Sequence, residues 1–388
     1  MRAPVPRKNI ALTSFTGKYY PAAIGQSCHL FWGAGPHPQF NRITAVIMPV
    51  LRILFAPEEK KRYPIWSSFY RGKGMFLALT FIVIGAALLI KGADLLVDGG
   101  AGIALKSGVS PLIVGLTVVA FGTSAPELAA SITAALKGSG DISYGNVVGS
   151  NIANIALILG ATALIRPVSV NQGLIRWEMP FLVVITAITW AIGGGGEVTR
   201  LLGAGLLVLF AVYLRHCMKS PTVPLDVEDG NVGRPYRTLA GMVVVGIAGL
   251  TGGGTLFVNG ARDIAASFGI SEAVIGLTVV ALGTSLPELI TSAIAAVKGH
   301  SDISVGNIVG SNIFNILLVI GATGIIRPYT INPDRYLTVI GLPAMMGLAV
   351  LLLPFAMSGK IINRIEGAFL TAVYCVYCVL AVLMSKGA

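Results

Sequence analysis

Two glutamates stand inside apolar stretches of the chain, each at the end of nearly the same hexapeptide. Glu127 closes the sequence GTSAPE and Glu288 closes GTSLPE. A carboxylate placed in hydrocarbon is costly, and such residues usually mark ion or substrate pathways. A threonine lies four residues before each glutamate, at Thr123 and Thr284, so hydroxyl and carboxylate share one face of a helix. This pattern predicts a cation site built from oxygen atoms.

Each hexapeptide also contains a proline, which removes a backbone hydrogen-bond donor. Pro126 leaves the carbonyl of Gly122 without its helical donor, and Pro287 has the same effect in the second copy. Freed carbonyls at membrane depth are tolerated where they line a cavity or bind a cation. We therefore expect the adjacent serines, Ser124 and Ser285, to supply further ligands where the helix is unwound.

The next apolar stretch in each copy carries a polar ladder, GNVVGSNIAN and GNIVGSNIFN. Polar residues recur at every fourth position and form one stripe: Asn146, Ser150 and Asn154 in the first copy, and Asn307, Ser311 and Asn315 in the second. Asn146 and Asn307 fit either direct coordination or a supporting hydrogen bond. Asn151 and Asn312 fall off the stripe and are predicted to pack. Oxygen donors without histidine or thiol suit Na⁺ and Ca²⁺, not zinc or copper.

These motifs belong to an internal repeat. Residues 108–171 return as residues 269–332, with about three in five positions identical. Glycines before the motifs repeat at the same spacing, so each half is predicted to hold five helices. Because five is odd, the second copy enters the membrane from the opposite side, which predicts inverted repeats with an ion site between them.

Composition places the chain in a bilayer. It is 54% hydrophobic and 12% charged, whereas soluble domains carry about a quarter charged residues. We predict an all-α integral membrane protein with about ten transmembrane helices. The apolar stretches begin near Met75, Val109, Ile142, Glu178, Leu201, Thr238, Ile270, Ile303, Tyr336 and Ile362. The sequence lacks a phosphate-binding GxxxxGK[ST] motif, so we infer that an ion gradient supplies the energy.

The predicted organisation has four parts: an N-terminal extension over residues 1–74, a first repeat over 75–215, a linker over 216–237 and a second, inverted repeat over 238–388. The extension holds eleven Lys and Arg residues against two glutamates, so it contributes most of the net charge of +11. We expect it to be disordered or to result from the choice of start site. The basic charge therefore does not predict a nucleic-acid partner.

The paired motifs resemble the α-repeats of the sodium/calcium exchanger branch of the cation/calcium exchanger superfamily, in its compact prokaryotic form. The resemblance implies ten helices in two inverted repeats, with Glu127 and Glu288 as central ligands shared by Ca²⁺ and Na⁺ and with Asn154 and Asn315 completing that site. It also implies flanking sodium ligands: Thr123, Ser124, Thr284, Ser285, Ser150 and Ser311, with the carbonyls of Ala120 and Ala281. Some relatives carry aspartate where this chain has Asn315, which leaves two central carboxylates.

The leading hypothesis is an antiporter that exchanges Na⁺ for Ca²⁺ by alternating access across a prokaryotic cell membrane. Ca²⁺, Na⁺ and the lipid bilayer are its expected partners; we expect no enzyme activity, no cofactor and no obligate protein partner. Proton-driven exchange of Ca²⁺ or another divalent cation is the alternative within this class. A different class, a non-transporting membrane scaffold with a lipid-binding basic tail, would need the tail and not the glutamates.

Overall fold

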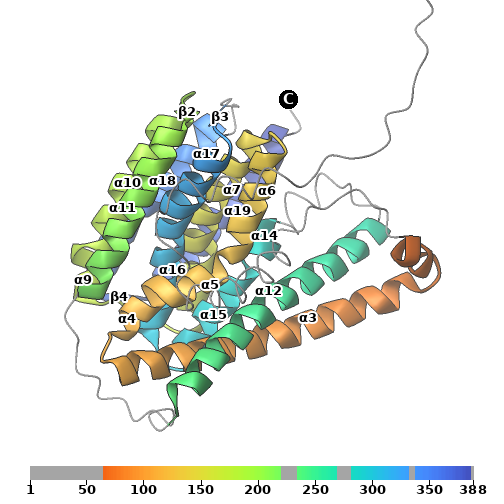
Figure 1. Cartoon of the computed structure of the whole chain (residues 1–388), viewed down its shortest axis with the longest axis horizontal. Coiled ribbons are helices and arrows are strands. Elements are labelled where there is room, and N and C mark those ends of the chain that lie inside the picture. The colour runs from red at the N-terminus through yellow and green to blue at the C-terminus, as the bar shows by residue number, and fades with distance from the viewer. Residues whose placement is uncertain (1–63, 220–233, 269–280, 332–336, 386–388) are drawn as a thin grey trace, which may run out of the picture. The chain divides into compact units, whose positions relative to one another are not determined.

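The computed structural model describes residues 64–219, 234–268, 281–331 and 337–385 (Figure 1). The predicted extension up to residue 63, most of the predicted linker and the predicted helix starts at Ile270 and Tyr336 lie outside these residues. The described part of the chain is almost entirely helical, with four two-residue strands. The all-α membrane fold predicted from the composition is confirmed.

The elements of the first half, in chain order, are α3 (Pro64–Ser107), α4 (Pro111–Val114), η1 (Gly115–Val119), α5 (Ala120–Thr123), α6 (Ala125–Leu136), α7 (Gly140–Ile152), η2 (Ala153–Leu159), α8 (Gly160–Ile165), β1 (Val168–Ser169), α9 (Gln172–Arg176), α10 (Glu178–Gly193), β2 (Glu197–Val198) and α11 (Arg200–Lys219), where η denotes a π-helix. Helix α3 begins before the predicted start at Met75. Proline is favourable in the first turn of a helix, and no further proline interrupts α3 after Pro64.

The elements of the second half are α12 (Tyr236–Ser267), α14 (Ala281–Thr284), α15 (Leu286–Val297), α16 (Ser301–Phe314), η4 (Asn315–Ile320), α17 (Gly321–Ile326), β3 (Tyr329–Thr330), η5 (Leu337–Gly341), α18 (Leu342–Met357), β4 (Ile361–Ile362) and α19 (Arg364–Ser385). Eight of the described helical spans are long and apolar enough to cross a membrane. A ninth consists of two segments, Pro111–Thr123 and Ala125–Leu136, bent by 47° at their junction.

Helices α3 and α12 run side by side in Figure 1 and are packed closely along their lengths. Glycines make this contact possible. A Cβ atom on Gly85 would lie 2.8 Å from the carbonyl oxygen of Gly253, and one on Gly92 would lie 2.8 Å from that of Gly246. These distances are below van der Waals contact, so the glycines set how closely the backbones approach. The repeat thus contributes the same glycines to both sides of the pair.

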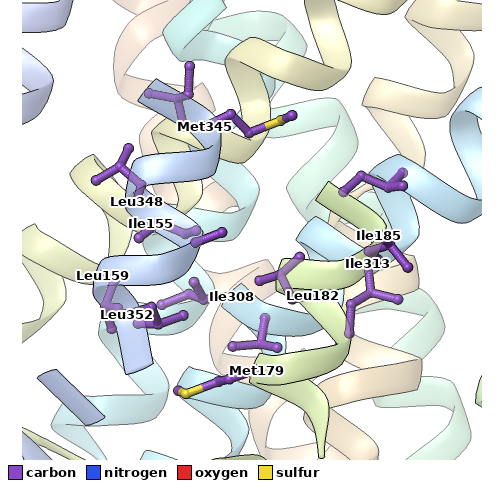
Figure 2. Close-up of a cluster of buried hydrophobic side chains, with 14 of the residues drawn as sticks. Ile155, Leu159, Met179, Leu182, Ile185, Ile308, Ile313, Met345, Leu348 and Leu352 are labelled. Atoms are coloured by element: carbon purple, nitrogen blue, oxygen red, sulfur yellow. The ribbon is translucent and has the colours of Figure 1, made fainter. Parts of the chain in front are cut away.

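The polar-ladder helices are the most buried of the spans. In the most apolar stretch of the spans Gly140–Ile165 and Ser301–Ile326, 72% and 83% are buried inside the protein. The corresponding share in the span of α3 is 17%. Figure 2 shows apolar side chains packed around them, with Ile155 and Ile308 from the central helices near Leu352 of α18. A polar ladder on such helices cannot reach water easily, so its groups need partners within the protein or a bound ion.

Short contacts tie the two halves together at the helix ends. Strand β1 pairs with β4, and β2 pairs with β3, so each antiparallel pair takes one strand from each half. The Arg166 guanidinium donates to the carbonyl oxygen of Val297 at 2.5 Å, and Arg327 donates to that of Leu136 at 2.6 Å. Each arginine thereby satisfies a carbonyl at the C-terminus of a helix in the opposite half.

Candidate cation site

The helix that carries each glutamate is interrupted at the serine two residues before the proline. Ser124, between α5 and α6, has φ −84° and ψ 4°, and Ser285, between α14 and α15, has φ −89° and ψ 3°. The prolines occupy the second positions of α6 and α15. The interruption predicted from the prolines is therefore present in both copies, and it places each glutamate in the first turn of a new helix. The positive end of a helix dipole favours an anion there.

Both glutamates are fully buried, with Glu127 2% and Glu288 1% exposed. The two halves meet at this point, because the Ser124 hydroxyl donates to Oε1 of Glu288 at 3.0 Å. The corresponding serine, Ser285, lies near Glu127 but its hydroxyl does not reach hydrogen-bonding geometry. One interruption is thus bonded to the opposite carboxylate, while the other leaves its hydroxyl available.

The first rung of each ladder supports the glutamate helix. Asn146 Nδ2 donates to Ser131 Oγ at 2.9 Å, and Asn307 Nδ2 donates to Ser292 Oγ at 3.0 Å. Asn307 Oδ1 also accepts a hydrogen bond of 3.0 Å from the Thr123 hydroxyl. Of the two roles that the sequence left open for these asparagines, the observed geometry favours support.

The asparagines next to the ladder serines also join the halves. Asn315 Nδ2 donates to Asn151 Oδ1 at 3.1 Å, and Asn151 Nδ2 donates to the carbonyl oxygen of Asn312 at 3.4 Å. The prediction that Asn151 and Asn312 only pack was incomplete, since Asn151 orients a predicted ligand. An amide on each copy of a buried helix was the available signal, because a buried amide requires a partner.

A π-helix begins at the last rung of each ladder. Segment η2 starts at Ala153, next to Asn154, and η4 starts at Asn315 itself. Short π segments within α-helices occur frequently at functional sites, where the wider turn redirects a side chain and loosens backbone pairing. The even four-residue spacing of the ladder predicted a regular α-helix at these positions, and no feature of the sequence indicates the wider turn.

Several buried oxygen atoms of the predicted ligands have no hydrogen-bond partner within the described residues. They are Oε2 of Glu127, Oε2 of Glu288, Oδ1 of Asn154, Oδ1 of Asn315, Oγ of Ser285 and Oγ of Ser311. Leaving a buried acceptor unsatisfied costs about 1–3 kcal/mol, and more for a charged group. These six atoms come from both glutamates and both ladders, and all are oxygen donors of the type that Ca²⁺ prefers.

The remaining predicted ligands are placed as follows. Ser150 is buried on α7 and Thr284 is half-buried at the end of α14. The Ala120 carbonyl already accepts bonds from the Ser124 amide and the Thr123 hydroxyl. Ala281 is the first residue of α14.

A cavity of about 170 Å³ lies between α12 and the two interrupted helices. Pro126 and Pro287 form part of its wall, which brings it next to both glutamate turns. The α12 side contributes a polar face of Thr251, Thr255 and Asn259. The cavity therefore connects a polar helix face to the segments where the carboxylates are positioned.

Comparison with known proteins decides the family. The sequence matches the family described as sodium/calcium exchanger protein over residues 77–219 and 238–383. The chain belongs to this family.

Individual relatives agree with this assignment. The CaxA protein of Alkalimonas amylolytica is 42% identical over 318 residues, covering 78% of this chain and 98% of CaxA. The inner membrane protein YrbG of Escherichia coli is 36% identical over 277 residues, covering 68% and 84%. Structures of the sodium-calcium exchanger NCX_Mj are similar as well; one has a TM-score of 0.68 at 32% identity and covers 78% of this chain and 97% of that one. This family member is thus a multi-pass membrane antiporter of calcium and another cation, and not an enzyme.

Proposed function

We propose that this chain exchanges Na⁺ for Ca²⁺ by alternating access, at a site formed by Glu127, Glu288, Asn154 and Asn315. The observation that carries the proposal is the set of buried, unsatisfied oxygen atoms contributed by both halves. Ca²⁺ takes six to eight oxygen ligands, and Na⁺ accepts the same type of donor. NCX_Mj, which is described as a sodium-calcium exchanger, supports the choice of ions.

Charge balance explains why exchange would be coupled. One Ca²⁺ neutralises the two carboxylates, and so would two Na⁺ ions, whereas an ion-free site holds two buried negative charges. Buried unpaired charge is costly. The ion-free protein therefore resists the conformational change in which this site is closed off from water on both sides. Because Asn315 is an amide and not a carboxylate, the site carries two charges instead of three.

The surrounding residues take supporting roles in this proposal. Ser285 and Ser311 supply hydroxyl ligands to flanking Na⁺ ions, together with Ser124, Ser150 and the threonines Thr123 and Thr284. Asn146 and Asn307 hold the glutamate helices against the ladders through Ser131 and Ser292. The carbonyls of Ala120 and Ala281 complete the sodium sites at the helix interruptions.

The two repeats, over residues 75–215 and 238–388, would act as the two structural halves around this site. The cavity against Thr251, Thr255 and Asn259 is the proposed access route in the observed arrangement. These three side chains carry oxygen atoms that can contact a cation on its way to the glutamate turns, where the carboxylates replace the water.

The test is ⁴⁵Ca²⁺ uptake into proteoliposomes loaded with Na⁺, with K⁺-loaded and acid-loaded vesicles alongside. The proposal expects uptake that requires internal Na⁺ and falls to background in Glu127→Gln. Uptake driven by internal acid alone would establish proton/calcium exchange instead, with the glutamates carrying the protons. Absence of Ca²⁺ uptake under every gradient would exclude Ca²⁺ as the substrate.

A further inference from the structure

Two buried polar groups outside the cation site, one on α10 and one on α11, line the same cavity. Glu178, the first residue of α10, is 6% exposed, and its Oε2 atom has no hydrogen-bond partner within the described residues. Tyr213 of α11 is 5% exposed, and its hydroxyl likewise lacks one; the Cys217 thiol, a weak partner, lies nearby. Neither group takes part in the proposed exchange, so their burial calls for another explanation.

Both groups line a cavity of about 200 Å³ whose other walls are largely aromatic. Phe181 and Tyr213 stack with ring centroids 5.6 Å apart and planes within 8°. Trp177 and His216 contact at 5.6 Å with a 55° tilt. Each aromatic pair takes one ring from the α10 side and one from α11, so the rings frame the space between the helices.

Aromatic faces combined with a buried carboxylate select an organic cation. A metal ion fits poorly, because within the described residues no three His, Cys, Asp or Glu side chains are grouped to hold one. The two unsatisfied oxygens distinguish between organic cations. A primary ammonium can donate hydrogen bonds to Glu178 Oε2 and to Tyr213 Oη, whereas a quaternary ammonium cannot donate to either.

The sequence around the cavity matches a membrane–water interface. Arg176 ends α9, Arg215 is exposed near the end of α11, and Lys219 is the last residue of that helix. Aromatic residues beside basic ones at helix ends are typical of the headgroup layer, and arginine pairs well with phosphate. The apolar side chains of Val208 and Val212 on α11 are exposed and suit contact with acyl chains.

We propose that this cavity binds the headgroup of an ethanolamine phospholipid, with the ammonium at Glu178 and Tyr213 and the phosphate beside Arg176 and Arg215. The primary ammonium supplies the donors that the two oxygens lack, and the aromatic rings screen it from the hydrocarbon. The lipid then bridges α10 and α11 from the bilayer side.

Among the described residues of the second half, the carboxylate of this site has no counterpart. Alignment of Pro180 with Pro343 places Gly341 opposite Glu178, which removes the carboxylate. Gly203 and Gly367 make equivalent helix contacts, with the Gly321 and Gly160 carbonyls respectively, and aligning them places Tyr377 opposite Tyr213. Tyr377→Phe is therefore a matched control for Tyr213→Phe. The lipid contact would be confined to one half, and hence to one face of the membrane.

The experiment reconstitutes the full chain in a bilayer of phosphatidylethanolamine and phosphatidylcholine in equal amounts. After extraction, retained lipid is measured by native mass spectrometry. The wild type and Tyr377→Phe should retain phosphatidylethanolamine preferentially. In Glu178→Gln the ratio of retained phosphatidylethanolamine to phosphatidylcholine should fall roughly tenfold, because a charge-assisted hydrogen bond is removed. In Tyr213→Phe the ratio should fall by less.

Equal retention of the two lipids by the wild type, or an unchanged preference in Glu178→Gln, would overturn the proposal. If Glu178→Gln does not fold, as judged by gel filtration, Tyr213→Phe against Tyr377→Phe decides. A final arm adds soluble phosphoethanolamine. Displacement of the retained phosphatidylethanolamine by this headgroup analogue would support recognition of the headgroup at the cavity, whereas retention that the analogue does not reduce, even in large excess, would contradict it.

Discussion

At the scale of single residues, the unusual feature is two buried carboxylates without a basic partner. Among the ion pairs of the described residues, none includes Glu127 or Glu288. Removing an ion from water costs several kcal/mol unless an opposite charge compensates. A bound cation supplies that charge, and the two predictions that follow depend on this balance.

Neutralising one carboxylate should weaken Ca²⁺ binding without lowering the stability of the ion-free protein. In Glu288→Gln we expect Ca²⁺ affinity to fall at least about tenfold, since a charged ligand is lost. The melting temperature in ion-free buffer should stay the same or rise, because the repulsion between buried charges is relieved. Stabilisation by added Ca²⁺ should disappear. Thermal melting with and without Ca²⁺ checks all three; a lower melting temperature in ion-free buffer would assign Glu288 a structural role.

Adding a carboxylate should have the opposite effect. Asn315→Asp places a third negative charge at the start of η4. We expect a lower melting temperature in ion-free buffer and a larger stabilisation by Ca²⁺ than in the wild type, because the added charge raises both the repulsion and the attraction for the ion. The same melting assay measures both quantities. Asn312→Asp, on the same helix, is the control, and an equal gain of Ca²⁺ stabilisation there would contradict the assignment of Asn315.

At the scale of helices, glycines fix how α3 and α12 pack. In Gly92→Ala the new Cβ would lie 2.8 Å from the Leu250 amide, so we expect a loss of about 1–3 kcal/mol of stability. Gly241→Ala on α12 meets nothing within 4 Å and should be neutral or stabilising by up to about 1 kcal/mol. Thermal unfolding in detergent measures the difference. Equal melting temperatures for the two variants would show that this close approach is not needed.

An ion pair joins α3 to the end of α15. Lys298 Nζ lies 2.5 Å from Asp94 Oδ1 and 2.5 Å from Asp98 Oδ1. Burial lowers the pKa of Lys298, but the hydrogen bonds that its ammonium donates to the two aspartates outweigh burial and raise the pKa above its ordinary value. A raised lysine pKa contributes stability below about pH 10.5, which is lost only as pH rises through the folded-state pKa. The lysine charge is therefore retained at neutral pH.

We expect this ion pair to stabilise the arrangement in which the α12 cavity is open. In a Thr255→Cys background, Lys298→Gln should slow labelling of the new cysteine by a thiol reagent about twofold or more. The expected effect is modest because a partly exposed ion pair contributes little free energy. Lys137 directly follows α6 as Lys298 directly follows α15, but α12 carries Thr255 and Asn259 where α3 carries the aspartates. Lys137→Gln is thus the matched control. Faster labelling in Lys298→Gln would show that the pair holds the cavity closed.

At the scale of the whole molecule, the repeat region should be sufficient for transport. Deleting residues 1–63, which lie outside the described residues, should leave Na⁺-driven Ca²⁺ uptake within about twofold of the full chain, because every residue of the proposed site lies beyond residue 119. Flux in proteoliposomes containing matched amounts of protein checks this. Abolition of function by the deletion, with Glu127→Gln still active, would instead favour the scaffold hypothesis.

The sequence predicted the parts of this molecule that depend on local chemistry. Pro126 and Pro287 predicted the helix interruptions because proline lacks an amide donor, and the repeat predicted equivalent elements in both halves. Contacts between the halves were not predictable. The bond from Ser124 to Glu288 and the bond from Asn315 to Asn151 depend on how two separate repeats meet. The π turns depend on packing around the ladders, which residue spacing does not encode.

The most direct test of the central claim is equilibrium binding of ⁴⁵Ca²⁺ to the purified chain, titrated with Na⁺. The account predicts that Na⁺ displaces Ca²⁺ completely and with a sigmoidal dependence, because more than one Na⁺ replaces one Ca²⁺ at the two carboxylates. Glu127→Gln and Glu288→Gln should each lose Ca²⁺ binding, while Glu197→Gln, at the exposed residue of β2, should not. Ca²⁺ binding that persists in both site variants, or that Na⁺ does not displace, would contradict a shared site between the halves.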